Sequence, residues 1–228
     1  MELKADGISR IFFRNGKNTN FFHAVNKTDF SLESGKITVI IGKSGSGKTT
    51  FINMLAGLLC PTEGKVLLDG QDLYEMDDAK RSRLRNVSFG IIPQGHTGLS
   101  SLTVLENVLA PVYMYESGKS KKEKALDLLK FLGIDELQEV YSDELSGGEQ
   151  RRMSIARALI GNPKIIIADE PTGDLDDETT VKVLDLLKKY AINGAAVLIV
   201  THDDIAVKYA DYLYKMDNGN LINARPDT

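Results

Sequence analysis

The stretch GKSGSGKTT at residues 42–50 constrains the fold of this chain more than any other segment. It follows the short β-branched run ITVII and precedes the apolar stretch TTFINMLAGLL, an order that predicts strand, loop and helix. Glycine lacks the Cβ that would clash in a tight loop whose backbone N–H groups point inward. We therefore expect a buried strand that leads into an anion-binding loop at the start of a helix.

The residue types in this loop suit a nucleoside triphosphate. Gly42, Gly47, Lys48 and Thr49 match the spacing of the P-loop, or Walker A motif. In that motif the lysine reaches the β- and γ-phosphates and the hydroxyl coordinates Mg²⁺. A glycine-rich turn that arose by chance is the alternative, and the lysine, the threonine and the flanking strand argue against it. We predict an ATP-binding loop made of Gly42, Lys43, Ser44, Gly45, Ser46, Gly47, Lys48, Thr49 and Thr50.

Two further apolar runs indicate more strands of the same sheet. KIIIADE at residues 164–170 and AAVLIVTHD at residues 195–203 are apolar without alternation, which is typical of parallel strands covered on both faces. Residues 178–192 lie between them with helical spacing, so the segment predicts a strand–helix–strand unit. The residues expected on the buried face of that helix are Val181, Leu184, Leu187 and Ala191.

The first and middle parts of the chain differ from these strands in their residue patterns. Residues 12–36 mix aromatic residues with turn formers, as antiparallel strands do, and the middle of the chain has helical rather than strand patterning. We predict an α/β fold: a P-loop NTPase core of mainly parallel sheet, with an antiparallel β edge subdomain and an inserted helical subdomain. One domain is expected over residues 1–228, with edge and core in about 1–94 and 146–228 and the helical subdomain in about 95–145.

Two carboxylates stand where the run at residues 164–170 ends. Asp169 is expected at the carboxyl end of the sheet, where it can hold Mg²⁺ through water. Glu170 follows it, and on an extended backbone its side chain would point the other way. A carboxylate close to the γ-phosphate can orient or deprotonate the attacking water. A solvated strand end would explain this pair in isolation, but the complete P-loop favours the catalytic interpretation.

A second glycine loop opens another helix. In LSGGEQRRMSIARAL at residues 145–159, Ser146 suits an N-cap and Glu149 follows three residues later, as in a capping box. The apolar positions that come next form one helical face. Taken alone, this pattern predicts only a well-capped helix.

With these segments in this order, the sequence resembles the ATP-binding subunits of ABC transporters over nearly its whole length. Glu149 stands where that family commonly has glutamine, and Pro93 replaces the common aromatic residue before Gln94. A proline fixes φ and removes an N–H donor, which changes how the loop can bend. The segments that carry the resemblance are Walker A at residues 42–49, the Q-loop at Gln94, the signature loop at residues 145–150, Walker B at Ile165–Asp169, the D-loop at residues 173–176 and the switch histidine His202.

The resemblance implies a composite site. In this family the signature loop of one subunit closes on ATP held by the P-loop of another, so two head-to-tail subunits enclose two MgATP molecules. The signature residues implied to contact the partner's ATP are Leu145, Ser146, Gly147, Gly148, Glu149 and Gln150, and those of the D-loop are Leu175 and Asp176. The implied catalytic residues are Glu170, His202 and Gln94, and the implied magnesium ligands are Thr49, Gln94 and Asp169.

Two of these assignments have structural alternatives. A lone histidine at a strand end is more often structural, but the TH context of His202 favours a γ-phosphate contact. Phe12 aligns best with the aromatic residue that stacks on adenine in the family. Phe13, Phe21 and Phe22 are close by, and core packing would explain any one of them as well.

The amino-acid sequence around two motifs indicates which class of ABC protein the chain resembles. SSLTVLENVLAPVYM and ADEPTGDLD are similar to the exporter and mechanotransmission class, which includes lipoprotein-release, macrolide-efflux and antimicrobial-peptide-resistance ATPases. The resemblance implies integral membrane permease subunits as partners, with a coupling helix docked on residues 102–114, although helical-subdomain core is the alternative for that segment. The competing class is a soluble ABC-type ATPase acting in assembly or nucleic-acid maintenance. Members of that class carry long coiled-coil insertions or duplicated domains, and this sequence has neither.

Charge and cysteine content agree with the transporter interpretation. The formal net charge is −4, so no nucleic-acid partner is expected. Cys60 is the only cysteine, which fits a reducing compartment, and the charged N-terminus has no apolar signal region. The longest apolar runs are too short to cross a bilayer. We expect a cytoplasmic subunit held at the inner face of the cell membrane through its permease.

Overall fold

Two β-sheets organise the chain, and the computed structural model describes residues 1–14, 20–95, 97–115 and 121–224. The larger sheet has six strands in the order β10-β9-β3-β8-β7-β6. Its first five strands in sequence pair in parallel, and β10 runs antiparallel to β9. The bounds are β3 (Ile37–Ile41), β6 (Phe89–Ile92), β7 (Ile165–Asp169), β8 (Ala196–Thr201), β9 (Tyr212–Asp217) and β10 (Asn220–Asn223).

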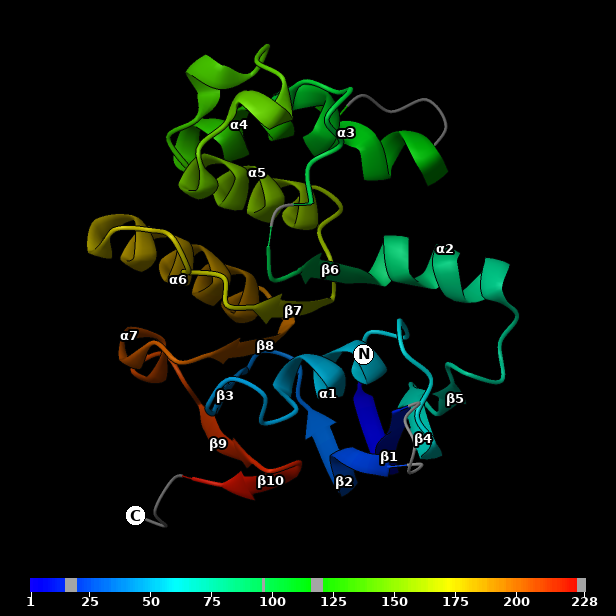
Figure 1. Ribbon diagram of the computed structural model, residues 1–228. Coiled ribbons are helices and arrows are strands. Elements are labelled where there is room, and N and C mark those ends of the chain that lie inside the picture. The colour runs from blue at the N-terminus through cyan, green and yellow to red at the C-terminus, as the bar shows by residue number, and fades with distance from the viewer. Residues whose placement is uncertain (15–19, 96, 116–120, 225–228) are drawn as a thin grey trace.

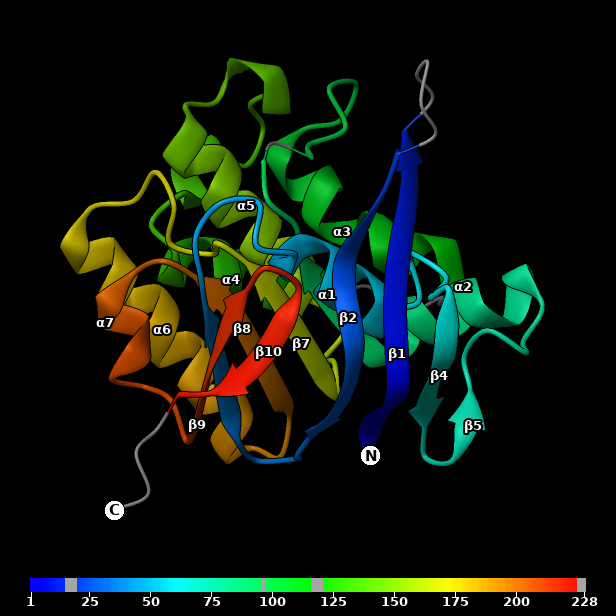
Figure 2. The same ribbon diagram turned by 60° about the horizontal axis from the view of Figure 1, so that its bottom comes forward.

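The smaller sheet is antiparallel and lies beside the larger one, as Figure 2 shows on its right. It has four strands in the order β2-β1-β4-β5. The bounds are β1 (Leu3–Arg14), β2 (Asn20–Leu32), β4 (Glu63–Leu68) and β5 (Gln71–Asp72). This sheet is the predicted antiparallel edge, so the predicted α/β fold class is confirmed.

Seven α-helices are described, and they occupy distinct places around the sheets (Figure 1). Helices α3, α4 and α5 group together at the top of that view, α6 and α7 lie along one side, and α1 lies between the two sheets. The bounds are α1 (Lys48–Leu55), α2 (Asp78–Ser88), α3 (Val104–Tyr115), α4 (Lys122–Phe131), α5 (Gly147–Leu159), α6 (Asp177–Ile192) and α7 (Asp204–Val207). Two 3₁₀ turns cover Asp135–Leu137 and Ser142–Glu144.

The central strands are buried on both faces because each face meets its own hydrophobic cluster. In β7, Ile166 and Ala168 join the cluster built with α3 to α6, whereas Ile165 and Ile167 join the cluster that contains α1 and the antiparallel sheet. Phe51 of α1 is fully buried in the second cluster. This explains why the strand sequences are apolar without alternation, since neither side chain direction meets water.

Helix α6 differs from its predicted face at one position. Leu184, Leu187 and Ala191 are buried as predicted, but Val181 is 40% exposed. Thr180 and Val183 occupy the buried face in its place. A helix turns by about 100° per residue, so on a face centred near Leu187 the side chain of Val181 points about 120° away, towards solvent.

The described part of the chain contains no helix that combines the length and apolar character required to span a bilayer.

Candidate active site

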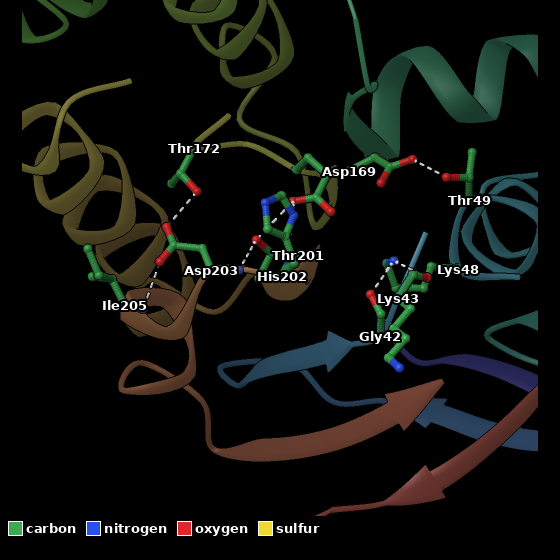
Figure 3. Close-up of polar contacts among 11 residues, drawn as sticks. Gly42, Lys43, Lys48, Thr49, Asp169, Thr172, Thr201, His202, Asp203 and Ile205 are labelled. Carbon is green, nitrogen blue, oxygen red and sulfur yellow. Dashed lines mark hydrogen bonds and ion pairs between the residues drawn. The ribbon is translucent and has the colours of Figure 1, made fainter. Parts of the chain in front are cut away.

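All the predicted ATP-binding residues except the buried Ser46 line one cavity of about 860 Å³. It opens where β3, β7 and β8 end, which is the edge of a parallel sheet at which such folds bind ligands. Figure 3 shows Thr49 joined to Asp169 by a hydrogen bond, and Lys48 joined to the backbone of Gly42 and Lys43. The cavity is lined by Phe12, Phe22, His23, Ala24, Gly42, Lys43, Ser44, Gly45, Gly47, Lys48, Thr49, Thr50, Gln94, Asp169, Glu170, His202, Asn218 and Gly219.

The P-loop backbone requires glycine at two positions. Gly47 has φ +107°, and a Cβ placed there would lie 2.2 Å from the carbonyl oxygen of Ala24. A Cβ on Gly42 would lie 2.5 Å from the carbonyl oxygen of Met216. Both separations are far inside van der Waals contact, so any larger residue would displace the loop. The glycines therefore let the loop pack against β2 and β9 while helix α1 starts at its end.

The side chain of Lys48 bends back onto the backbone of this loop. Its Nζ donates to the carbonyl oxygens of Gly42 (2.7 Å) and Lys43 (3.2 Å), and the residue is only 8% exposed. An ammonium group held by neutral carbonyls keeps its full positive charge for a ligand. The N-terminus of α1 adds a partial positive charge at the same place. The arrangement is suited to phosphate oxygens.

Thr49 and Asp169 meet across the cavity at hydrogen-bond distance. The Thr49 hydroxyl donates to Oδ2 of Asp169 at 2.8 Å, and Asp169 is 3% exposed. Burial raises the pKa of Asp169 above its usual range, while the bond from Thr49 and the charges of Lys48 and Arg151 oppose that rise. The described residues contain no group of three acidic, histidine or cysteine side chains that would form a protein-only metal cage. Magnesium bound with a triphosphate needs only one or two protein oxygens, and these two fit that requirement.

Glu170 lines the same cavity, but the reason for its direction differs from the prediction. Its φ is +49°, so the backbone leaves the extended conformation immediately after β7. Its Oε2 accepts from the Thr201 hydroxyl (3.0 Å) and from the backbone N–H of His202 (3.3 Å). The direction of the Glu170 side chain therefore does not result from the alternation of side chains along an extended strand, and that part of the prediction is wrong. A left-handed turn and two donors from the end of β8 hold the carboxylate in place.

His202 is paired with Glu170. Its Nδ1 lies 3.0 Å from Oε2 of Glu170, and its side chain is 78% exposed. The hydrogen bond and the charge of Glu170 raise the pKa of His202, and burial opposes the rise. Asp203 steadies the same turn, because it accepts from the Thr172 hydroxyl (2.9 Å) and the Ile205 N–H (2.8 Å) (Figure 3).

This pairing predicts a measurable titration of His202. In the nucleotide-free protein without Mg²⁺, we expect its pKa to lie above the usual histidine value. Glu170→Gln should lower it, because the neutral amide no longer favours the imidazolium form. Proton NMR can follow this titration easily, since the chain contains only three histidines. An unchanged His202 pKa in Glu170→Gln would contradict the pairing.

The signature loop begins α5 with a capping arrangement. Oε2 of Glu149 accepts from the backbone N–H of Ser146 (2.8 Å) and from its hydroxyl (2.6 Å). These bonds lower the pKa of Glu149. Gln150 donates to the Leu145 carbonyl at 3.3 Å. Ser146 itself is exposed, and among the described residues that line the cavity none belongs to the signature loop.

The D-loop packs against the signature loop of the same chain. A Cβ added to Gly148 would lie 2.9 Å from the carbonyl oxygen of Asp174. Leu175 is half-buried against the core, and Asp176 caps α6 by accepting from the Thr179 N–H at 2.8 Å. The two loops therefore lie in contact, and neither contributes a residue to the described lining of the cavity.

Phe12 lies at the edge of the nucleotide cavity. Its ring stacks on Phe22 with centroids 5.6 Å apart, and the Arg10 guanidinium lies 4.7 Å from its centroid. Both phenylalanines line the cavity. Phe13 is 70% exposed and Phe21 is 61% exposed, and neither lines the cavity.

Several cavity residues were not predicted from the sequence. Gly219 donates its N–H to the Ser46 carbonyl at 2.9 Å, and its own carbonyl accepts from Asn26 at 2.8 Å. The β9–β10 hairpin thereby braces the P-loop, and Asn218 reaches the cavity edge. The Asn-Gly dipeptide between two short apolar segments is a hairpin signal that marks this turn. No local pattern indicates that the turn contacts the P-loop.

Comparison with known proteins decides the family. The family model described as ABC transporter matches residues 25–173. The chain belongs to the ABC transporter family. It is 40% identical over 212 residues to the lipoprotein-releasing system ATP-binding protein LolD of Buchnera aphidicola subsp. Acyrthosiphon pisum, covering 91% of this chain and 92% of the relative. It is 38% identical to the macrolide export ATP-binding/permease protein MacB of Mannheimia succiniciproducens, covering 93% of this chain and 33% of that protein.

Solved structures agree with this assignment. The dimeric structure of MJ0796, a bacterial ABC transporter cassette, superposes with a TM-score of 0.91 at 32% identity, covering 99% of this chain and 100% of that one. A post-hydrolysis dimer of MJ0796 bound to ADP and Pi gives the same TM-score at 31% identity. The chain is therefore an ATP-binding ABC cassette with ATPase activity, and its resemblance to the lipoprotein-release and macrolide-efflux class is confirmed.

Proposed function

We propose that this ABC cassette works as a head-to-tail pair that encloses two MgATP molecules and drives conformational change in separate membrane permease subunits. The process served is export or mechanotransmission of a peptide, lipoprotein or drug. One observation carries the composite site: Ser146 of the signature loop is exposed next to the D-loop, and no described residue of the signature loop lines its own nucleotide cavity. A phosphate from a second copy can reach this exposed loop.

The chemistry of each site is divided between two chains. Glu170 orients or deprotonates the attacking water, and Lys48 with the partner's signature loop stabilises charge on the γ-phosphate. Thr49, Asp169 and Gln94 would hold Mg²⁺, and the ion would neutralise phosphate charge when bound. The His202 side chain is 78% exposed, so solvent surrounds its ring, and it can turn from Glu170 to donate a hydrogen bond to the anionic γ-phosphate.

Solved relatives support the pair. The MJ0796 cassette, which covers 99% of this chain, forms a dimer in two structures, one of them a post-hydrolysis state bound to ADP and Pi. Phosphates held between two helix N-termini favour closure when ATP is bound, and loss of the γ-phosphate weakens it. Identical subunits are the simplest arrangement, since a head-to-tail pair needs only one kind of chain.

A groove between α2 and α3 is the surface proposed for the permease. It has a volume of about 360 Å³, and two apolar side chains that line it are strongly exposed: Val87 (55%) and Met114 (71%). Within residues 102–114 the earlier apolar positions Val104, Leu105, Val108, Leu109 and Val112 are core. Only the end of α3 is therefore available, and we propose that it receives an apolar coupling helix of the permease at the inner face of the membrane.

Co-purification tests this function. A tagged permease encoded beside this chain should retain the wild-type protein from detergent-solubilised membranes. Met114→Glu should reduce retention at least about tenfold, since a charge in an apolar contact is left unpaired. Ile222→Glu is the matched control, because Ile222 is also about half exposed but lies on β10. Equal retention of both variants would contradict the groove. Recovery only in the membrane-free fraction, with the permease present, would favour the soluble ABC-type alternative.

A further inference from the structure

Arg151 is a buried cation on the signature helix that the roles above leave unused. It is only 5% exposed, although it lies six residues from the start of the signature loop. Its Nη1 donates to the carbonyl oxygen of Pro93 at 2.7 Å, so α5 holds the residue that precedes Gln94. Burying a guanidinium is costly unless it is bonded and compensated by opposite charge. Its position therefore calls for a physical reason.

Three carboxylates supply the opposite charge. Burial lowers the pKa of Arg151, and attraction to Asp174, Asp169 and Glu170 opposes the decrease. The guanidinium also approaches the turn after β7, because a Cβ added to Gly173 would lie 3.9 Å from Nη2. One planar group thus faces the Q-loop with one nitrogen and the Walker B and D-loop turn with another. Arginine can do this because its donors form a rigid fork.

A second arginine of α5 holds the other side of the Q-loop. Nη1 of Arg157 donates to the carbonyl oxygen of Thr97 at 2.7 Å. Gln94 lies between the two attachment points and reaches the nucleotide cavity. Pro93 contributes by fixing φ and by having no N–H, so its carbonyl is the only backbone hydrogen-bonding group it offers. The proline that departs from the family pattern is therefore the acceptor for Arg151.

We propose that Arg151 is a positioning residue that couples the Q-loop to the Walker B carboxylates: its guanidinium links the Pro93 carbonyl to the turn that carries Glu170. Movement of Gln94 towards a bound nucleotide then moves the charge beside Asp169 and Glu170. The coupling acts on the catalytic step and not on the P-loop that binds ATP. This inference rests on the roles proposed above for Gln94 and Glu170.

Two substitutions test the geometry of the guanidinium donors separately from their positive charge. Arg151→Gln removes both the paired donors and the charge. Arg151→Lys keeps the charge on a single nitrogen, which can reach either the Q-loop or the turn after β7 but not both. In steady-state ATPase assays of the full chain we expect Arg151→Gln to lower kcat about tenfold or more, with KM for ATP within about twofold. Arg151→Lys should recover part of the lost kcat. Arg85→Gln is the control, because Arg85 also donates to a backbone carbonyl, that of Gly57 at 2.9 Å, on helix α2.

Fluorescence gives a second readout that does not depend on turnover. The chain contains no tryptophan, so Leu99→Trp introduces a single reporter just after the Q-loop at a half-exposed position. Adding MgATP should change the acrylamide quenching of this tryptophan when Arg151 is unchanged, and also when the Arg85→Gln control is introduced. The change should be absent in Arg151→Gln and intermediate in Arg151→Lys.

The outcomes decide the inference separately from the proposed function. Unchanged kcat in Arg151→Gln overturns it, and so does an equal loss of kcat and melting temperature in Arg151→Gln and Arg85→Gln, which would indicate a structural role alone. If Arg151→Gln does not fold, wild-type kcat and quenching in Arg151→Lys overturn it. The catalytic role of Glu170, on which this inference rests, fails if Glu170→Gln retains turnover, so the two failures are distinguishable.

Discussion

Glu170→Gln is expected to lower the ATPase kcat by about 10²–10⁴-fold while leaving ATP affinity nearly unchanged. The amide has the shape of the carboxylate and can still accept from Thr201 and from the His202 N–H, which hold Glu170 in the structure. It cannot accept a proton from water. Because hydrolysis no longer ends the closed state, MgATP should shift the variant from monomer to dimer on size exclusion.

A matched carboxylate away from the cavity provides the control. Glu178 is exposed on α6 and pairs with Lys182 at 2.7 Å, so Glu178→Gln should hydrolyse ATP like the wild type. Wild-type turnover in Glu170→Gln would show that another group activates the water. A variant without turnover that stayed monomeric with MgATP would separate the catalytic role from dimer closure.

Lys48→Ala should lose nucleotide affinity. The ammonium is buried and is held only by the carbonyls of Gly42 and Lys43 among the bonds described, so its charge is directed at the ligand. Removing a buried charged partner of this kind costs about 2–5 kcal/mol, which is a loss of about thirtyfold or more in affinity. Isothermal titration with ATP measures this directly.

Lys182→Ala is the corresponding control for affinity, since Lys182 is an exposed helix lysine paired with Glu178. It should bind ATP like the wild type. Equal affinity of Lys48→Ala and Lys182→Ala would remove Lys48 from the phosphate site. Far-ultraviolet circular dichroism establishes that each variant is folded.

The parallel sheet and its P-loop could be predicted because their signals are local. The runs at β3, β7 and β8 are apolar throughout, and they proved to be covered by two separate hydrophobic clusters. Helix α2 has a weaker sequence pattern, because Ser88 is its only buried residue. The sequence patterns of the strands β4 and β5 are also weaker. Val181 was misplaced because spacing alone does not fix where a helical face is centred.

The candidate site was predictable as a set of residues but not as a geometry. Each motif fixes residue types at short spacing, so Lys48, Thr49 and Asp169 could be assigned to one cavity. The Arg151–Pro93 bond joins residues 58 positions apart, and the pairing of Glu170 with His202 depends on a left-handed turn. Such contacts follow from tertiary packing, which no local pattern encodes.

Mixing two inactive variants tests the composite site most directly. Lys48→Ala disables the P-loop and Ser146→Arg disables the signature loop, so each alone should hydrolyse almost no ATP. In a mixed dimer, the intact P-loop of one chain meets the intact signature loop of the other. An equimolar mixture should therefore recover about a quarter of wild-type activity, since half of the dimers are mixed and each has one intact site. A mixture no more active than its two components would contradict a nucleotide site shared between chains.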